Sequence, residues 1–456
     1  LVFISLAMFG NYYVYDCISP LADVLKAQLG FSDSNIGLLQ AIYSFPNIVM
    51  VLVGGVIIDR IGTKKSTLLF GSICFVGAAV TAWADAPVLL ALAGAVSLPF
   101  EWIAGLLGHP FTLAPGSRLV VVMAAGRLIF GLGAESLIVG VTTAIARWFK
   151  GKELSFAFGI NLTIARLGSF AALNSPSWAW RSFEHWQWPL LISVGFGTFC
   201  VVGAILYWIL EAQAERRYQL RAAGPTDKVD LRQMKFGASY WFIVALCITF
   251  YSGIFPFQTF AVKFFIEAHG TTREIGGALS SSLTFFAMIC TPLFGLLVDR
   301  VAKRSLFMML GSLLLVPVYL MMAYTRMPEL VAFNLPVPFT AIVFPVYIPM
   351  IMMGIAFSLI PAVMWPSVAY VVEQSKLGTA YGLMTMIQNI GLFGFNLLIG
   401  WANDHWGASA TNAGGYAPGM WMFSCVGFFG LLFAFLLRRS ETGPHAHGLE
   451  TITTKA

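Results

Sequence analysis

The chain has 456 residues, of which 58% are apolar and only 11% are charged, and its mean hydropathy is +0.80. This composition excludes a water-soluble domain and indicates a protein whose solvent is the lipid bilayer. The formal net charge is +6. Most of the basic residues lie in short loops that we predict to be cytoplasmic, where membrane topology requires them, so we expect no nucleic-acid partner.

Apolar runs of roughly 20 residues, the length that spans a bilayer as a helix, recur along the chain. They predict an all-α membrane protein with spans at 1–20, 34–58, 65–84, 119–147, 153–176, 187–210, 238–265, 273–298, 304–325, 341–372, 378–402 and 418–438. Because the chain begins at Leu1 and not at methionine, we expect a start that precedes it.

The only long polar interior stretch, residues 211–237, divides six predicted spans from six. We therefore predict a first half at 1–210, a cytoplasmic linker at 211–237, a second half at 238–438 and a cytoplasmic tail at 439–456. Residues 85–117 mix apolar residues with Gly and Pro, and we predict an outer interfacial hairpin there. No metal-ligand spacing, phosphate loop or nucleophile motif occurs, so we expect no metal, no cofactor and no enzymatic activity.

A short loop occurs twice, at corresponding places in the two halves. Its copies contain Gly55, Asp59, Arg60, Lys64 and Lys65, and Gly295, Asp299, Arg300, Lys303 and Arg304. This duplicated loop resembles a signature of the major facilitator superfamily. The resemblance implies a twelve-helix fold of two six-helix halves with inverted repeats, and solute transport by alternating access.

A carboxylate at a helix end can accept charge-assisted hydrogen bonds from a neighbouring helix. We therefore predict that Asp59, Arg60, Asp299 and Arg300 act as a gate; the alternative is that the basic residues only anchor the loops at the membrane surface.

Three charged residues, Arg127, Glu135 and Arg166, fall inside predicted helices, where a charge needs a partner or a cavity. Arg127, followed by Gly131 and Gly133, resembles the fourth-helix motif of the superfamily, in which glycines let helices approach closely. Arg127 lies nearer the outer face than the middle, and we group it with the gating residues, although a structural role explains it equally well.

Glu135 and Arg166 are expected near the bilayer midplane, where transporters of this build bind substrate. A carboxylate and a guanidinium that face one cavity suit a zwitterion, and Asn161 precedes Arg166 by about one turn. The alternative is an ion pair between Glu135 and Arg166 that only packs two helices. From the second half we predict that Tyr251, Gln388 and Asn389 line the cavity.

Several runs of sequence resemble the family of lysosomal dipeptide transporters more specifically. They are Gly-Asn-Tyr-Tyr-Val-Tyr-Asp from Gly10, Tyr-Ser-Phe-Pro-Asn from Tyr43, Gly-Ala-Glu-Ser-Leu from Gly133, Trp-Phe-Lys-Gly-Lys-Glu-Leu from Trp148, Ala-Arg-Leu-Gly-Ser from Ala165, and residues 377–391. The resemblance implies uniport of dipeptides, especially cationic ones, with the substrate's amino end on Glu135 and its carboxylate on Arg166. It also adds Tyr43 to the expected binding residues and leaves an accessory subunit open.

The single Asn-X-Ser/Thr sequence, at Asn161, falls inside a predicted helix, so we expect a microbial plasma membrane, with a lysosomal membrane as the alternative.

Three other functions remain open. In an organic-anion exchanger of the oxalate/formate type, Arg127 and Arg166 would both face the cavity and Glu135 would support one of them. In a proton-coupled symporter, Asp16 is an alternative proton carrier. A receptor or scaffold with a transporter fold is the third.

Overall fold

The computed structural model describes residues 1–95, 115–149, 154–218, 236–324, 347–373, 376–444 and 446–451, apart from the side chains of residues 59, 115–117 and 154–156. Within these ranges, ten segments are long and apolar enough to cross a membrane. With α1 (Val2–Asp16) and α6 (Leu154–Leu173), they form an all-helical membrane fold of twelve spans.

The first half contains α1 and α6 together with two long helical segments, α3 (Asp33–Ala82) and α5 (Pro115–Phe149), and with α8 (Gln187–Tyr218). The shorter elements are η1 (Ser19–Leu21), α2 (Ala22–Leu29), α7 (Ser175–Trp178) and η2 (Trp180–Glu184). The label α3 covers two spans. They are separated by a bend at Gly62, where the backbone φ of 80° favours glycine. In packing, α3 contacts α5 and α8, and α1 contacts α6 and α8.

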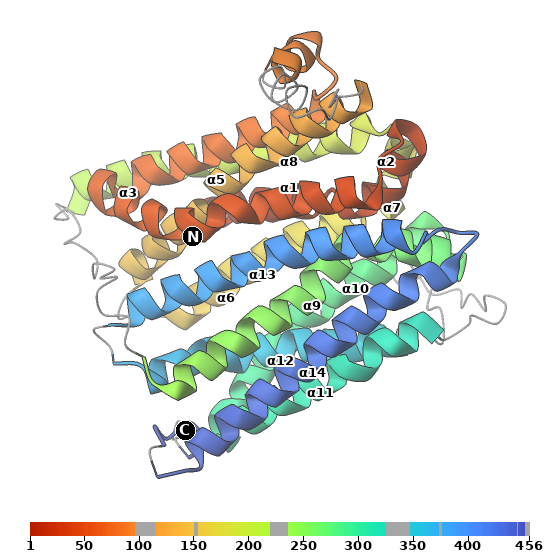
Figure 1. Cartoon of the computed structure of the whole chain (residues 1–456). Helices are drawn as coiled ribbons and strands as arrows, with labels where there is room; N and C mark the ends of the chain where they lie inside the picture. Colours follow the sequence, from red (N-terminus) through yellow and green to blue (C-terminus); the bar gives the residue numbers. More distant parts are fainter. Residues whose placement is uncertain are drawn as a thin grey trace, which may run out of the picture.

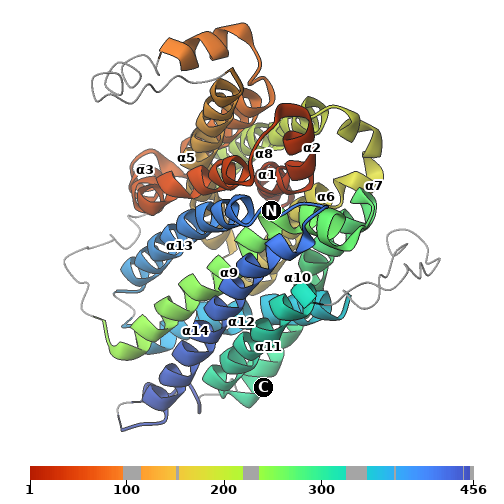
Figure 2. The ribbon, with the colours of Figure 1, turned by 45° about the vertical axis from the view of Figure 1, so that its right-hand side comes forward.

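The second half contains α9 (Ala238–His269), α10 (Arg273–Val301), α11 (Arg304–Tyr324), α12 (Tyr347–Val371), α13 (Leu377–His405), η5 (Ala413–Tyr416) and α14 (Ala417–Glu441). Within it, α9 packs against α13 and α14, α10 against α12, and α11 against α12 and α14. The halves meet where α13 packs on α3 and where α6 packs on α10. Figures 1 and 2 show α13 along the boundary between the halves.

Each of the twelve predicted spans overlaps a helix of the structure, and the spans at 34–58 and 65–84 share α3. Residues 153, 325 and 341–346 of the predicted spans lie outside the described residues. One boundary differs clearly, since α8 continues to Tyr218 and so includes the start of the stretch predicted as a linker. Glu211 and Glu215 extend this helix by pairing with Arg147 of α5 and Lys64 of α3. Residues 219–235 of the predicted linker lie outside the described residues. In the predicted outer hairpin, residues 87–95 are helical and residues 96–114 are not described.

The close helix approach predicted for the glycines of α5 is confirmed. A Cβ added at Gly131 would lie 2.3 Å from the carbonyl oxygen of Tyr43, and one added at Gly133 would lie 2.6 Å from that of Phe70. Because both oxygens belong to the α3 backbone, any side chain at these positions would force α5 away from α3. These glycines therefore hold the middle of α5, including Glu135, against α3.

We call the end with Arg60, Lys64, Arg147 and Arg304 the inner end, since the distribution of basic residues predicts that it is cytoplasmic. The opposite end, with α2, α7 and the first residue of α3, is the outer end. In Figure 1 the outer end lies on the right, and both chain termini lie on the left.

Candidate functional site

Glu135 lies in the middle of α5 and contacts the first half of α3. The Tyr43 hydroxyl donates a hydrogen bond of 3.3 Å to Oε1 of the Glu135 carboxylate. Tyr43 also packs against the rings of Tyr15 and Phe130, with centroid distances of 4.7 and 5.4 Å. The structure thus places two of the sequence-predicted site residues, Glu135 and Tyr43, in direct contact within an aromatic surrounding.

Arg166 lies in the middle of α6 and contacts the second half of the protein. Its guanidinium carbon is 4.6 Å from the ring centroid of Phe357 on α12, a cation–π geometry. Among the described side chains, no ion pair joins Arg166 to Glu135, and the Glu135 carboxylate has its hydrogen bond from Tyr43. The structure therefore does not contain the packing ion pair that the sequence left open as an alternative.

Tyr12 and Asp16, one turn apart on α1, both lie near Arg166, and Tyr12 also lies near Glu135. Tyr12 interacts electrostatically with Arg166, Glu135 and Asp16. Asp16 is 5% exposed, and its carboxyl group lies near the Ser169 hydroxyl. It is within electrostatic range of Arg166 and Arg127 but forms no salt bridge among the described residues. Three charges from α1, α5 and α6 thus surround one phenol.

Aromatic residues of the second half face this group. Tyr251 on α9 is within electrostatic range of Arg166, and its hydroxyl accepts a hydrogen bond of 3.0 Å from Nε1 of Trp365 on α12. The ring of Phe255 stacks on Tyr251 at 5.6 Å and reaches Tyr15 of α1 at 6.1 Å. These contacts make a polar and aromatic region near the middle of the membrane, with charged groups from the first half and rings from the second.

The remaining predicted lining residues are less central. Asn161 and Asn389 are both buried, and the Oδ1 atom of each has no hydrogen-bond partner among the described residues. The Cys247 thiol donates to Oε1 of Gln388 at 3.6 Å. In the described hydrogen bonds, none of the three contacts Glu135 or Arg166.

Arg127 is 1% exposed and ties three segments of the first half together. Its guanidinium donates to the carbonyl oxygens of Val14 at 2.8 Å, Tyr15 at 3.1 Å and Leu39 at 3.3 Å. It also donates to Oε1 of Gln40. All of these partners belong to the first half, so the geometry supports the structural interpretation of Arg127, and its gating role stays a prediction.

The two duplicated loops lie at the inner end. The side chain of Asp59 is not described, and Arg60 and Arg300 are exposed. Asp299 forms an ion pair of 3.4 Å with Arg304, whose guanidinium also donates to the Tyr370 hydroxyl at 2.9 Å. The ion pairs between described residues at this end join residues of the same half.

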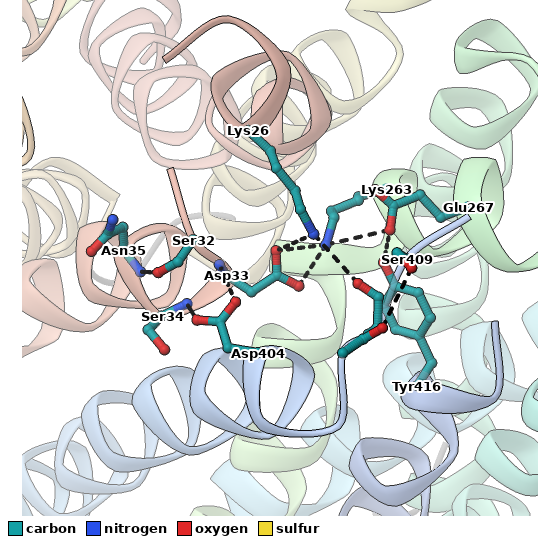
Figure 3. Close-up of polar contacts among 12 residues, drawn as sticks. Lys26, Ser32, Asp33, Ser34, Asn35, Lys263, Glu267, Asp404, Ser409 and Tyr416 are labelled. Carbon is teal, nitrogen blue, oxygen red and sulfur yellow. Dashed lines mark hydrogen bonds and ion pairs between the residues drawn. The ribbon is translucent and has the colours of Figure 1, made fainter. Parts of the chain in front are cut away.

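At the outer end, charged residues connect the two halves (Figure 3). Asp33, the first residue of α3, forms an ion pair of 2.5 Å with Lys263 of α9, and both side chains are 0% exposed. Lys26 of α2 is 3.6 Å from Asp33, and Glu267 is 3.5 Å from Lys263. We call Lys26, Asp33, Lys263 and Glu267 the outer charge cluster.

Asp404 adds a second connection beside the outer charge cluster. Its carboxylate, near the end of α13, accepts hydrogen bonds from the backbone N–H groups of Asp33 at 2.8 Å and Ser34 at 2.7 Å. A carboxylate at a helix N-terminus is favoured by the helix dipole and by unpaired N–H groups. Burial would lower the pKa of Lys26, but the nearby Asp33 and Glu267 carboxylates raise it above its ordinary value. The outer charge cluster therefore favours the charged form of Lys26.

Sequence reasoning missed the outer charge cluster and also Tyr12 and Phe357. A charge at a predicted helix end is normally a solvated interfacial residue, and an aromatic residue in a span is normally packing. In the sequence, Ser32 followed by the acidic Asp33 indicates the start of a helix, because a serine side chain caps the first turn. This pattern does not indicate that Asp33 forms an ion pair with a residue of α9.

Comparisons with known proteins agree with this architecture. The family model of the Major Facilitator Superfamily matches residues 4–393. The lysosomal dipeptide transporter MFSD1 of Danio rerio is 30% identical over 403 residues, covering 86% of this chain and 77% of that protein. The human protein of the same name is 29% identical over 408 residues, covering 87% and 77%. A probable sulfoacetate transporter of Cupriavidus necator, SauU, is 24% identical over 308 residues, covering 63% and 61%.

Solved structures show the same fold. The nucleoside transporter NupG has a TM-score of 0.64 at 13% identity, covering 96% of this chain and 98% of that chain. An inward-open structure of the xylose transporter XylE from E. coli also has a TM-score of 0.64, at 16% identity, covering 95% and 94%. At these low sequence identities, the two structures support only the fold. The family model, in contrast, matches most of the sequence. The chain belongs to the Major Facilitator Superfamily and is a multi-pass membrane transporter.

Proposed function

We propose that this transporter is a uniporter for dipeptides. The observation that carries the proposal is that Glu135 and Arg166, of opposite charge, both interact with Tyr12 and form no ion pair with each other among the described residues. A dipeptide is a zwitterion, so its ammonium group would bind Glu135 and its carboxylate would bind the planar guanidinium of Arg166. Because each charge is partly buried and has no ion-pair partner among the described residues, a substrate that brings both counter-charges is strongly favoured.

Aromatic residues support a substrate larger than a single amino acid. The rings of Tyr251, Phe255 and Phe357 from the second half lie opposite the charged groups of the first half. Such rings offer apolar surfaces with polar edges to side chains of different kinds. The relatives named as dipeptide transporters support the same substrate class.

Asp16 supports a preference for dipeptides with a cationic side chain. With Glu135 and Arg166 bound to the two ends of the substrate, Asp16 is the remaining carboxyl group beside the site within the described part of the chain. A lysine or arginine side chain would supply its counter-charge, as a proton would in a symporter. Asp16 is therefore the residue at which a cationic preference and proton coupling are to be told apart.

An organic-anion exchanger is the second candidate, and the similarity to a probable sulfoacetate transporter favours it. That function would use both Arg127 and Arg166 for the anion. The guanidinium of Arg127 is already bonded to three carbonyl oxygens and to Gln40. An anion would thus have Arg166 alone, beside the opposing charge of Glu135, which disfavours this candidate.

We further propose that residues 1–210 and 238–438 are the two bodies that rock, with the chain between them as linker, and that Asp59 and Asp299 help to gate the inner end. For location we propose a microbial plasma membrane. The one glycosylation sequence, at Asn161, lies on α6 and is buried there. The relatives that are named lysosomal make a lysosomal membrane the alternative.

The test is uptake into proteoliposomes of labelled Lys-Ala, Ala-Ala, lysine and oxalate. Glu135→Gln and Arg166→Ala are each expected to reduce dipeptide uptake at least about 30-fold, because each leaves one end of the substrate without its charged partner. Glu274→Gln and Arg181→Ala make the same chemical changes at exposed positions and serve as matched controls. An imposed proton gradient is applied in a parallel experiment.

Each outcome identifies one function. Loss of dipeptide uptake in both site variants, with the controls unchanged and no effect of the gradient, supports a dipeptide uniporter. Oxalate uptake that survives Glu135→Gln but not Arg166→Ala would replace it with the anion exchanger. Uptake driven by the gradient would establish a symporter. Selective loss of Lys-Ala uptake in Asp16→Asn would assign the cationic preference to that residue.

A further inference from the structure

We propose that the outer charge cluster is a latch that works by exchange of ion-pair partners. In the closed outer end, Asp33 pairs with Lys263 across the two halves. On outward opening, Asp33 moves to Lys26 and Lys263 moves to Glu267, each within its own half. The proposal rests on the alternating access of the proposed function, but not on the identity of the substrate.

Several cross-half contacts at the outer end involve Asp33, beside a separate cross-half ion pair of 2.5 Å between Asp23 of α2 and Arg273 of α10. The Asp33 carboxylate receives both hydrogen bonds from Nζ of Lys263, at 2.6 and 2.5 Å. Its backbone N–H donates to Asp404. Its carbonyl oxygen lies so close to α13 that a Cβ on Gly400 would be 2.5 Å away. The start of α3 is thus held by the Lys263 side chain of α9 and by Asp404 near the end of α13 (Figure 3).

Separation of this pair without compensation would be costly, since both side chains are fully buried and a lone buried charge is strongly disfavoured. The cluster contains a spare partner for each charge. Lys26 lies on α2, in the same half as Asp33, and Glu267 lies one turn after Lys263 on α9. Both spare pairs are already within 3.6 Å in the closed state, so Asp33 and Lys263 can each keep an ionic partner when their mutual bond is given up. Opening also breaks the hydrogen bonds from Asp33 and Ser34 to Asp404 and the Asp23–Arg273 ion pair.

The inner end has the opposite arrangement. Among the described residues, its ion pairs include Arg147 with Glu211 and Glu215, Lys64 with Glu215, Arg304 with Asp299, and Lys376 with Glu373, and each pair lies within one half. The structure therefore shows a transporter whose outer end is tied shut by charges. A latch of two alternative pairings gives the bistable element that switching requires.

The proposal predicts opposite effects for two acidic residues of the same cluster. Asp33→Asn removes the cross-half pair and should favour the outward-open state. Glu267→Gln removes the spare partner that Lys263 needs after opening, and should favour the closed state. A merely structural cluster would not give effects of opposite sign.

The experiment measures labelling by a membrane-impermeant maleimide, added from the outer side, in a background without other reactive cysteines. Ser19→Cys is the reporter, because Ser19 is 2% exposed at the outer end and bonds to the carbonyl of Gln258 on α9. Asp33→Asn should raise the labelling rate at least about tenfold, and Glu267→Gln should lower it about threefold or more. Glu373→Gln, at an exposed inner-end ion pair, is the matched control and should change nothing.

A double variant keeps the test valid if Asp33→Asn folds poorly. Asp33→Asn with Lys263→Met leaves no unpaired charge in the cross-half bond, so it should regain stability and still label rapidly. Equal labelling rates in wild type and the double variant, or shifts of the same sign in Asp33→Asn and Glu267→Gln, would overturn the latch. Labelling needs no substrate, so failure of the dipeptide assay leaves this result independent.

Discussion

A single methyl group should act as a wedge at the outer end. Gly37 lies one turn after Asp33 on α3 and faces α13, where a Cβ at position 37 would be 2.4 Å from the carbonyl oxygen of Asn396. Ordinary contacts of a Cβ begin at 3.4 Å, so Gly37→Ala requires about 1 Å of separation between the two helices. Overpacking of this kind costs about 1–3 kcal/mol.

Separation of the halves relieves this cost without any unfolding, because Gly37 and Asn396 belong to different halves. The wedge should therefore shift the equilibrium toward the outward-open state by about 5- to 150-fold, since each 1.4 kcal/mol is a factor of ten. The assay is maleimide labelling of Ser19→Cys from the outer side, with the melting temperature of the purified protein measured in parallel. We expect faster labelling and a nearly unchanged melting temperature.

Gly71→Ala is the matched control for the wedge. A Cβ at position 71 would be 2.5 Å from the carbonyl oxygen of Cys200, a similar clash, but both residues lie in the first half. Rocking of the halves cannot relieve it, so Gly71→Ala should lower the melting temperature and leave labelling unchanged. If Gly37→Ala behaves in the same way as this control, the reasoning that treats the outer end as a separable contact is refuted.

Three further predictions concern the site and the gates. Tyr43→Phe removes one hydrogen bond to Glu135, at the long distance of 3.3 Å. The half-saturation concentration for a dipeptide should therefore rise about tenfold, with an unchanged melting temperature. An unaltered half-saturation concentration would show that Tyr43 does not belong to the site. Arg127→Lys keeps the charge but loses the planar fork, and should destabilise the protein by about 2–4 kcal/mol without changing substrate affinity, as thermal unfolding and binding assays would show. Asp59→Asn should reduce turnover severalfold while membrane insertion is kept; unchanged turnover would contradict its gating role.

The sequence predicts the fold well, because the bilayer imposes a simple rule. A lipid-facing span must be helical and apolar over roughly 20 residues, so its pattern is local and can be read directly from the chain. The extension of α8 to Tyr218 could not be predicted in this way. It depends on Glu211 and Glu215 meeting Arg147 and Lys64, and such contacts between distant segments leave no local pattern.

The candidate site was predictable in its charges but not in its pairing. Glu135 and Arg166 stand out because an intramembrane charge is rare and expensive. Whether they pair with each other depends on the rotation of α5 and α6, which hydrophobic patterning does not fix. Asp33 and Lys263 could not be recognised at all, since they are far apart in sequence and each lies at a helix end, where a charge is ordinary.

The site and the latch share two helices, and this connects substrate binding to opening. Helix α3 carries both Asp33 and Tyr43, ten residues or about 15 Å apart, and α9 carries both Lys263 and Tyr251, twelve residues or about 18 Å apart. Outward rocking that separates Asp33 from Lys263 must also move Tyr43 relative to Tyr251. A substrate held by both helices therefore gains or loses contacts during the partner exchange, so its binding energy differs between the two states. That difference is the only means by which a substrate can drive the switch.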